Sequence, residues 1–198
     1  MLKPKALRPG DTLGFVAPAS PTKTLEGVEQ SVEAARALGF EVVVGESCKN
    51  VHGYLSGDDQ MRADDLNRMF EDDAVDAVIA IRGGYGAPRI LDKLDFRLAA
   101  EHPKLLAGYS DITALHLAYG QKSGLITMHA PMPSTEWIQD DYDDFTRISL
   151  WRALTAAEPL GPVPNPPGFP VEILQGGVAR GRLTGGNLCL IAALNGTP

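Results

Sequence analysis

A single serine stands where a short apolar run meets a segment of helical character. The run Leu105-Leu106-Ala107 stops at Gly108, and Ser110 and Asp111 follow almost directly. A serine on a tight strand-to-helix turn holds its hydroxyl clear of the sheet, and the first amide groups of the helix point at the same place. The pattern therefore predicts a nucleophile at Ser110. The competing interpretation is that Ser110 only caps the helix, which is a common use of serine.

A glycine-rich loop, Arg82-Gly83-Gly84-Tyr85-Gly86, offers a second set of chemical groups. It matches neither the dinucleotide-binding spacing nor a P-loop, so it gives no support to nucleotide binding. Its backbone can be approached closely, and the amides of Gly84 and Asp111 together could form an oxyanion hole facing Ser110. Arg82 could bind a substrate carboxylate through two hydrogen bonds, or pair with one of the many aspartates.

A serine nucleophile requires a base, and the chain has four histidines. His129 is the best placed, because its loop is expected at the same edge as Ser110. His116 lies six residues into the helix after Ser110 and nearly opposite it around the axis. His52 and His102 fall in polar surface stretches. These residues alone give no complete catalytic triad.

The elements that must position these groups alternate between strands and helices, as in a parallel α/β sheet flanked by helices. Predicted strands cover 12–17, 40–44, 75–81, 105–107 and 126–128, and predicted helices cover 24–38, 58–70, 88–94 and 112–121. The loops Ala17–Pro21, Arg82–Gly86 and Gly108–Asp111 all follow strands. Since ligands bind at the carboxyl edge of such sheets, this convergence favours the functional interpretation of Ser110.

Composition narrows the class of protein. The 198 residues are 44% hydrophobic with a net charge of −7, and no basic stripe suggests a nucleic-acid surface. No apolar run could cross a bilayer and no secretory signal is recognisable, so a cytoplasmic protein without membrane contact is expected. Cys48 and Cys189 are far apart and lack metal-ligand spacing. We therefore expect no disulfide and no metal site.

The amino-acid composition of the chain changes after Ala153. Six prolines between residues 159 and 170 predict a stiff, extended connection. We therefore divide the sequence into an N-terminal α/β domain over 1–153, a proline-rich linker over 154–178, and the incomplete beginning of a C-terminal domain over 179–198.

Five segments together resemble the LD-carboxypeptidase family of serine peptidases, in order and in spacing. They are Val16–Pro21, Arg82–Gly86, Gly108–Thr113, His129–Met132 and Leu183–Leu188. The resemblance implies a flavodoxin-like N-terminal domain, a second domain that is truncated here, and a homodimeric cytoplasmic enzyme without metal or cofactor. Its implied reaction removes the terminal D-alanine from an L,D-linked murein tetrapeptide during cell-wall recycling.

Carried over by position, the resemblance implies that Ser110 is the nucleophile and that the amides of Gly84 and Asp111 form the oxyanion hole. Arg82, Ser20 and His129 are candidates for binding the muropeptide substrate. The family's triad glutamate and histidine lie downstream of the Gly185–Leu188 segment, so we expect this chain alone to be inactive. Two alternatives stay open: a non-catalytic muropeptide-binding module or inactive fragment, and a relative that cleaves peptide–nucleotide antibiotics.

Overall fold

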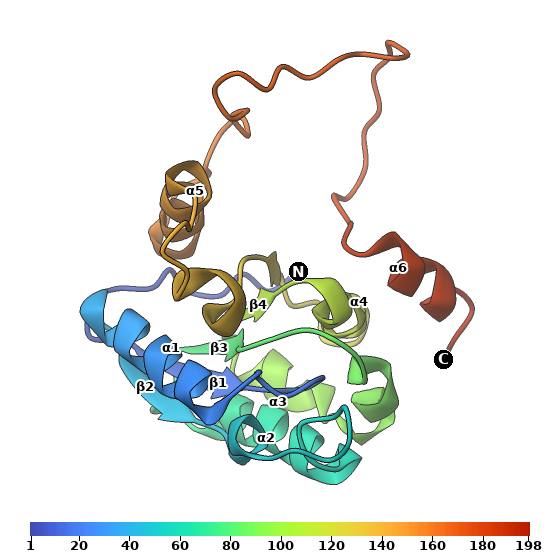
Figure 1. Cartoon of the computed structure of the whole chain (residues 1–198). Helices are drawn as coiled ribbons and strands as arrows, with labels where there is room; N and C mark the ends of the chain where they lie inside the picture. The colour runs from blue at the N-terminus through green and yellow to red at the C-terminus, as the bar shows by residue number, and fades with distance from the viewer.

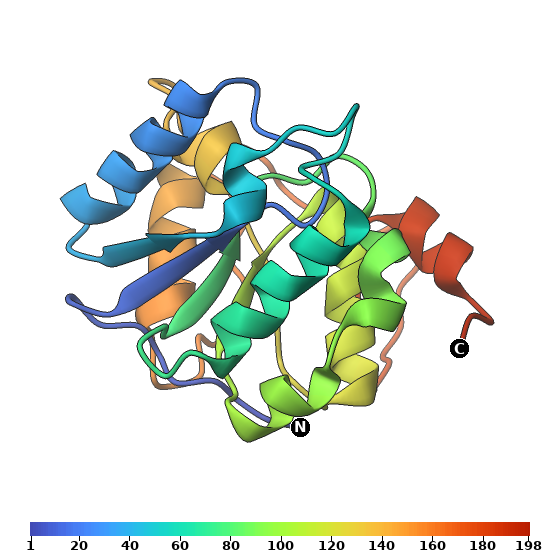
Figure 2. The same ribbon diagram turned by 90° about the horizontal axis from the view of Figure 1, so that it is seen from below.

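A computed structural model describes all residues, 1–198, and shows a sheet with helices on both faces (Figures 1 and 2). The strands are β1 (Thr12–Val16), β2 (Glu41–Val44), β3 (Ala77–Ala80), β4 (Leu105–Gly108) and β5 (Met128–His129). The α-helices are α1 (Leu25–Ala37), α2 (Asp59–Glu71), α3 (Phe96–Glu101), α4 (Thr113–Lys122), α5 (Asp144–Thr155) and α6 (Leu188–Leu194). Shorter helical turns are η1 (Glu46–Lys49), η2 (Ala87–Lys93), η3 (Ser110–Ile112) and the π-helical η4 (Pro133–Trp137).

The five strands are all parallel and lie in the order β2-β1-β3-β4-β5. This is the flavodoxin-like order, and it confirms the predicted α/β fold. Because the strands are parallel, the loops after β1, β3 and β4 emerge at one edge of the sheet. The expected convergence of the three loops is therefore confirmed.

Two apolar clusters, one on each face of the sheet, make the core. Alternate residues of a strand point to opposite faces, so Val78 enters one cluster and Ile79 the other. The first cluster packs against α2, α3 and α4, through side chains such as Phe70 and Tyr119. The second packs against α1 and α5 and includes Phe15. The helices hold the central strands buried and leave only their ends free to present functional groups.

Local capping explains where the longer helices begin. The side chain of Thr24 accepts a hydrogen bond from the Gly27 amide at the start of α1, and Asp58 accepts one from Met61 at the start of α2. Asp143 does the same for Thr146 in α5. Each oxygen satisfies an amide that has no partner inside its helix.

The structure specifies one predicted helix and adds two. The helix predicted over 88–94 is the 3-10 helix η2, whose start is fixed by contacts from outside: Asp111 accepts the Ala87 amide, and Arg62 donates to the Gly86 carbonyl. The sequence pattern predicted neither α3 nor α5. The first has only six residues, and the second begins inside an acidic stretch that is typical of a loop.

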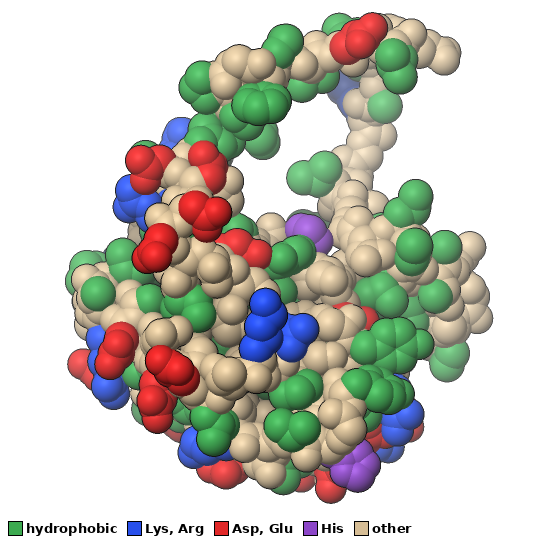
Figure 3. All heavy atoms as spheres, in the orientation of Figure 1, with side chains coloured by type: hydrophobic (Ala, Val, Ile, Leu, Met, Phe, Trp, Pro, Cys, Tyr) green, Lys and Arg blue, Asp and Glu red, His purple; other side chains and the backbone are tan.

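Residues 156–187 form no helix or strand and arch away from the body before α6 returns to it (Figure 1). Hydrophobic side chains are visible along this arch (Figure 3), and Val163, Leu174 and Leu183 are each more than 90% exposed. A specific contact holds the start of α6 against the body: the Asn187 amide donates to the Thr113 hydroxyl at 2.9 Å. A Cβ at Gly186 would lie 2.6 Å from Thr113, so only glycine allows this approach. No helix is both long and apolar enough to cross a membrane.

Candidate active site

The turn between β4 and α4 places Ser110 in an unusual backbone conformation. Its φ is +61°, and Ser110 is the one non-glycine residue with a positive φ. A non-glycine residue in this region costs about 1–3 kcal/mol and persists only where its surroundings hold it. Gly108 makes the turn possible, because a Cβ there would lie 3.0 Å from Ala80 and Ile112. The half-buried Ser110 is thus held by its turn in the position predicted for a nucleophile.

Several backbone amides beside Ser110 have no acceptor within the protein. They include the amides of Gly84 and Asp111, which the sequence suggested for an oxyanion hole. The glycine loop lies directly against the turn, since a Cβ on Gly83 would be 3.1 Å from the Ser110 Cβ. Unengaged donors next to a strained serine can stabilise negative charge on an attacked carbonyl oxygen.

Ser20 fixes the glycine loop from the β1 side. Its amide donates to the Gly83 carbonyl at 3.1 Å, and its hydroxyl accepts from the Tyr85 amide at 3.1 Å. A side chain on Gly84, whose φ is +109°, would collide with that hydroxyl. The structure therefore engages Ser20, predicted as a substrate-binding residue, in holding the loop. Arg82, the other candidate in this loop, donates to the Pro21 carbonyl and forms no ion pair with an aspartate.

Asp111 and Arg62 also hold the glycine loop in place. The buried Asp111 carboxylate accepts the Ala87 amide at 2.7 Å, and burial raises the pKa of this carboxyl. Arg62 is fully buried and donates to the Pro18 and Gly86 carbonyls at 2.5 and 3.0 Å. Its charge is paired with Asp59, while burial lowers its pKa. Sequence reasoning missed Arg62, because an arginine in an amphipathic helix ordinarily belongs to the solvent face.

Glu136, in η4, holds the nucleophile turn through hydrogen bonds. Its carboxylate accepts hydrogen bonds from the Tyr109 hydroxyl at 2.7 Å, the Met132 amide at 2.8 Å and the Thr135 hydroxyl at 2.7 Å. Burial, followed by the hydrogen bond to Glu136, raises the pKa of Tyr109. Tyr109 is the neighbour of Ser110, so this cluster ties the turn to η4. The sequence offered no signal for it, since Glu136 lies 27 positions away from Tyr109.

No histidine of the chain forms a hydrogen bond with Ser110. His116 bonds instead to the Gly108 carbonyl at 2.9 Å, and burial lowers its pKa to about 4. At neutral pH its Nε2 is therefore the protonated donor. The exposed His129 ring lies 6.0 Å from Tyr109 and 6.1 Å from His116, measured between ring centroids. His129 is thus near the turn, where a substrate contact is possible, but not in contact with the serine hydroxyl.

Comparisons with known proteins identify similar chains. The family model described as the LD-carboxypeptidase N-terminal domain matches residues 13–130. A probable murein peptide carboxypeptidase of Bacillus subtilis is 43% identical over 99% of this chain and 60% of its own length. A murein tetrapeptide carboxypeptidase of Pseudomonas aeruginosa is 29% identical over 93% of this chain and again 60% of its own length. This chain therefore spans about 60% of the length of these relatives.

Among solved structures, the wild-type microcin C7 self-immunity protein MccF superposes with a TM-score of 0.84. It is 26% identical, and the match covers 99% of this chain and 66% of that one. The match includes the arch and α6 as well as the sheet.

Proposed function

Since this chain belongs to the LD-carboxypeptidase family, we propose that it carries the nucleophile and oxyanion hole of a serine carboxypeptidase that releases D-alanine from L,D-linked murein tetrapeptides. The observation that carries the proposal is the strained Ser110 beside two amides without acceptors. The names of the two relatives support a murein peptide as substrate. The cytoplasmic location and the homodimer implied by the resemblance are parts of the same proposal.

In the proposed reaction, the Ser110 Oγ attacks the carbonyl carbon of the terminal peptide bond. The carbonyl oxygen becomes an oxyanion between the Gly84 and Asp111 amides, and one such donor contributes about 3–4 kcal/mol in other hydrolases. Collapse of the tetrahedral intermediate expels the amine of D-alanine and leaves an acyl ester on Ser110. Water then hydrolyses the ester, so the net change is the hydrolysis of one peptide bond.

The proton of Ser110 needs an acceptor that none of the four histidines of this chain provides. We assign this role to the glutamate and histidine that the family resemblance places downstream of the Gly185–Leu188 segment. The part of the family fold that this chain does not span would then complete the triad. Without it, only binding and the oxyanion hole contribute to catalysis, which leaves a small residual rate.

A second candidate function is the cleavage of a peptide–nucleotide conjugate. It is favoured by the likeness to MccF, which extends over 99% of this chain. Both functions use the same serine and the same amides. They differ in the group that the rest of the site must recognise.

The proposal predicts that Ser110→Ala in the protein that carries this chain abolishes the release of D-alanine from a murein tetrapeptide. The expected loss is at least 10³-fold in kcat, since no other group can form the acyl ester. Release is measured by chromatography of free D-alanine. Ser123→Ala is the matched control, because Ser123 bonds only within the end of α4. Undiminished release by Ser110→Ala would refute the serine mechanism, and preferred cleavage of a peptide–nucleotide conjugate would favour the second function.

A further inference from the structure

Two exposed tyrosines meet beside the glycine loop. Tyr54 and Tyr85 are 59% and 66% exposed, and their ring centroids lie 5.7 Å apart with the planes at 75°. An edge-to-face pair of this kind is a favourable aromatic arrangement. Both side chains nevertheless remain largely exposed to solvent. Exposed aromatic clusters of this kind often mark sites where a ligand binds.

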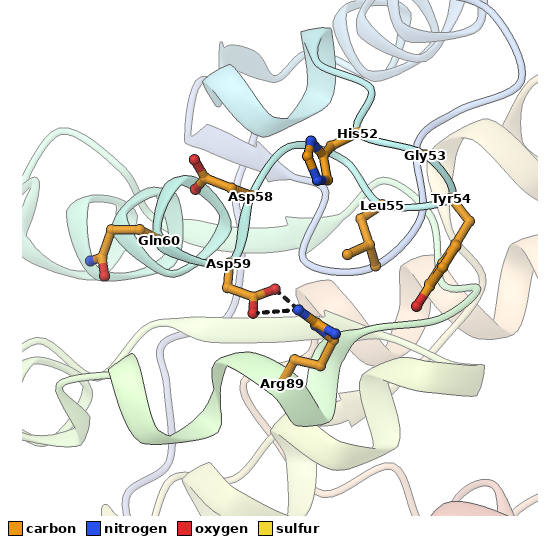
Figure 4. A pocket seen from close by; sticks show the side chains of 8 residues that line it. All are labelled: His52, Gly53, Tyr54, Leu55, Asp58, Asp59, Gln60 and Arg89. Carbon is orange, nitrogen blue, oxygen red and sulfur yellow. Dashed lines mark hydrogen bonds and ion pairs between the residues drawn. The ribbon is translucent and has the colours of Figure 1, made fainter.

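Tyr54 lines a hollow of about 560 Å³ (Figure 4), and Tyr85 packs against Tyr54 beside it. Figure 4 shows His52, Tyr54 and Leu55 on one wall and the pair of Asp59 and Arg89 on the other. A hollow of this volume is large enough for one or two sugar rings or a nucleoside. Its lining is mostly polar, which favours a ligand with many hydrogen-bonding groups.

The charged side chains of the hollow already have hydrogen-bond partners within the protein. Asp59 accepts two hydrogen bonds from Arg89, at 2.8 and 3.0 Å, and is also paired with Arg62. Asp58 accepts the Met61 amide at the start of α2. A charged ligand would have to break these pairs, so the hollow suits a neutral one. The His52 ring and the Tyr54 hydroxyl form no hydrogen bond within the protein and are free to bind it.

The hollow adjoins the proposed catalytic loop. Tyr85 directly follows Gly84, the proposed oxyanion donor, and Leu55 lies against Gly86. The Ser56 amide also donates to the Ala19 carbonyl at 3.0 Å, which joins the His52–Leu55 turn to the loop of Ser20. A bound substrate that extends from Ser110 across the glycine loop would therefore reach Tyr85 and then Tyr54.

We propose that Tyr54, Tyr85 and the hollow beside them form a subsite for a neutral amino sugar attached to the far end of the peptide substrate. The apolar C–H face of a pyranose ring can lie on a tyrosine face, while its hydroxyl and amide groups reach His52, Tyr54 and the polar wall. This inference rests on the proposed function, since it names what the peptide carries. A nucleobase could also contact a tyrosine. However, the two rings of an edge-to-face pair are not parallel, so a flat base cannot stack between them.

The kinetic test compares two substrates of the protein that carries this chain: the free tetrapeptide and the same tetrapeptide bearing the murein disaccharide. We expect the disaccharide to lower KM about tenfold, as one good ring contact would, with kcat unchanged. Tyr54→Ala should remove this advantage and leave the free tetrapeptide kinetics as they were. Tyr54→Phe keeps the ring and should restore most of the advantage. Equal KM values for both substrates, or an advantage that survives Tyr54→Ala, would overturn the subsite.

A binding test separates this inference from the proposed function, because it needs no turnover. Calorimetry with N,N′-diacetylchitobiose, a neutral amino-sugar disaccharide, should show saturable binding that Tyr54→Ala abolishes. Absence of binding would overturn the subsite even if D-alanine release is confirmed. Binding of adenosine that depends on Tyr54, in place of the sugar, would also overturn it and favour a nucleotide substrate. Sugar binding without any peptidase activity would support the subsite and contradict the proposed reaction.

Discussion

At the scale of single residues, the backbone of Ser110 is strained and its neighbours hold the strain in place. Tyr109 is anchored through its hydroxyl to Glu136, and Gly108 is anchored through its carbonyl to His116. Both anchors act on the residues immediately before the serine. A strained backbone that is held from two sides keeps the Cα and Cβ of the serine in one place, so less free energy is lost in positioning it during the reaction.

Removal of the Tyr109 hydroxyl tests this anchoring. In Tyr109→Phe the ring stays and the hydrogen bond to Glu136 is lost, which costs about 0.5–1.5 kcal/mol. We expect kcat to fall about twofold to tenfold with little change in KM, because the residue positions Ser110 and does not contact the substrate. Steady-state kinetics on the tetrapeptide measures both parameters.

Tyr142→Phe is the matched control, since the buried Tyr142 hydroxyl has no hydrogen-bond partner to lose. Its kcat should be unchanged. Glu136→Gln should lower kcat less than Tyr109→Phe, because the amide oxygen can still accept the Tyr109 hydroxyl, although it cannot accept all three donors. A rise in KM at constant kcat in Tyr109→Phe would show instead that the hydroxyl binds the substrate.

At the scale of elements, the loop between β3 and η2 is fixed by contacts from two different segments. Ser20 engages it after β1, and Asp111 engages its far end from the nucleophile turn itself. Asp111 therefore has two roles in the proposed site: its side chain holds the loop, and its amide is the proposed partner of the Gly84 amide in the oxyanion hole. Donors that are held in place before the substrate arrives need no reorganisation when charge develops.

A methyl group at Gly84 tests whether this loop must keep its shape. In Gly84→Ala the new Cβ overlaps the Ser20 hydroxyl, so the loop has to move and its amide with it. We expect kcat to fall by about 10²-fold or more, the usual cost of losing one oxyanion donor. The measurement is tetrapeptide turnover alongside thermal unfolding.

Gly10→Ala provides the control for backbone strain alone. Gly10 also has a left-handed φ, +90°, but a Cβ there meets nothing within 4 Å. Both variants should lose about 1 kcal/mol of stability from the unfavourable φ, and only Gly84→Ala should lose turnover. A Gly84→Ala protein with full activity would exclude this amide from the oxyanion hole.

At the scale of the whole molecule, the sequence predicted the sheet but not all of the site. Strands such as Ala77–Ala80 are short, wholly apolar and separated by amphipathic helices, so local pattern alone is enough to order them. The convergence of the loops that carry Ser110, Gly84 and Asp111 was predictable, because these loops follow strands of one parallel sheet. Arg62 and Glu136 were not, since each acts through contacts 24 to 44 positions away in the chain. Such pairings depend on packing that no local pattern encodes.

The stability of the molecule should fall in mild acid because of His116. Its pKa is about 4 in the folded state, through burial and the nearby His129, and about 6.5 in the unfolded chain. Between these values the unfolded state binds more protons, so the free energy of unfolding decreases as the pH falls from 6.5 towards 4. The loss from this group is at most about 3 kcal/mol.

Urea unfolding at pH 7 and pH 4.5 measures this loss. His116→Gln should reduce the difference between the two pH values, because glutamine does not titrate and can still donate to the Gly108 carbonyl. His102→Gln is the control, since His102 pairs with Asp73 on the surface and its loss leaves His116 in place. An unaltered difference in His116→Gln would mean that other groups cause the acid sensitivity.

The hydrogen bond from Asn187 to Thr113 also sets an order in time. The two residues are 74 positions apart, and a ribosome adds about 5–20 residues per second. About 4–15 s therefore pass between the synthesis of the nucleophile turn and that of Asn187, which bonds to the start of α4. During this interval the serine already exists on a nascent chain in which Thr113 has not yet bonded to Asn187. The order of synthesis thus puts the nucleophile turn in place before the segment that binds to it.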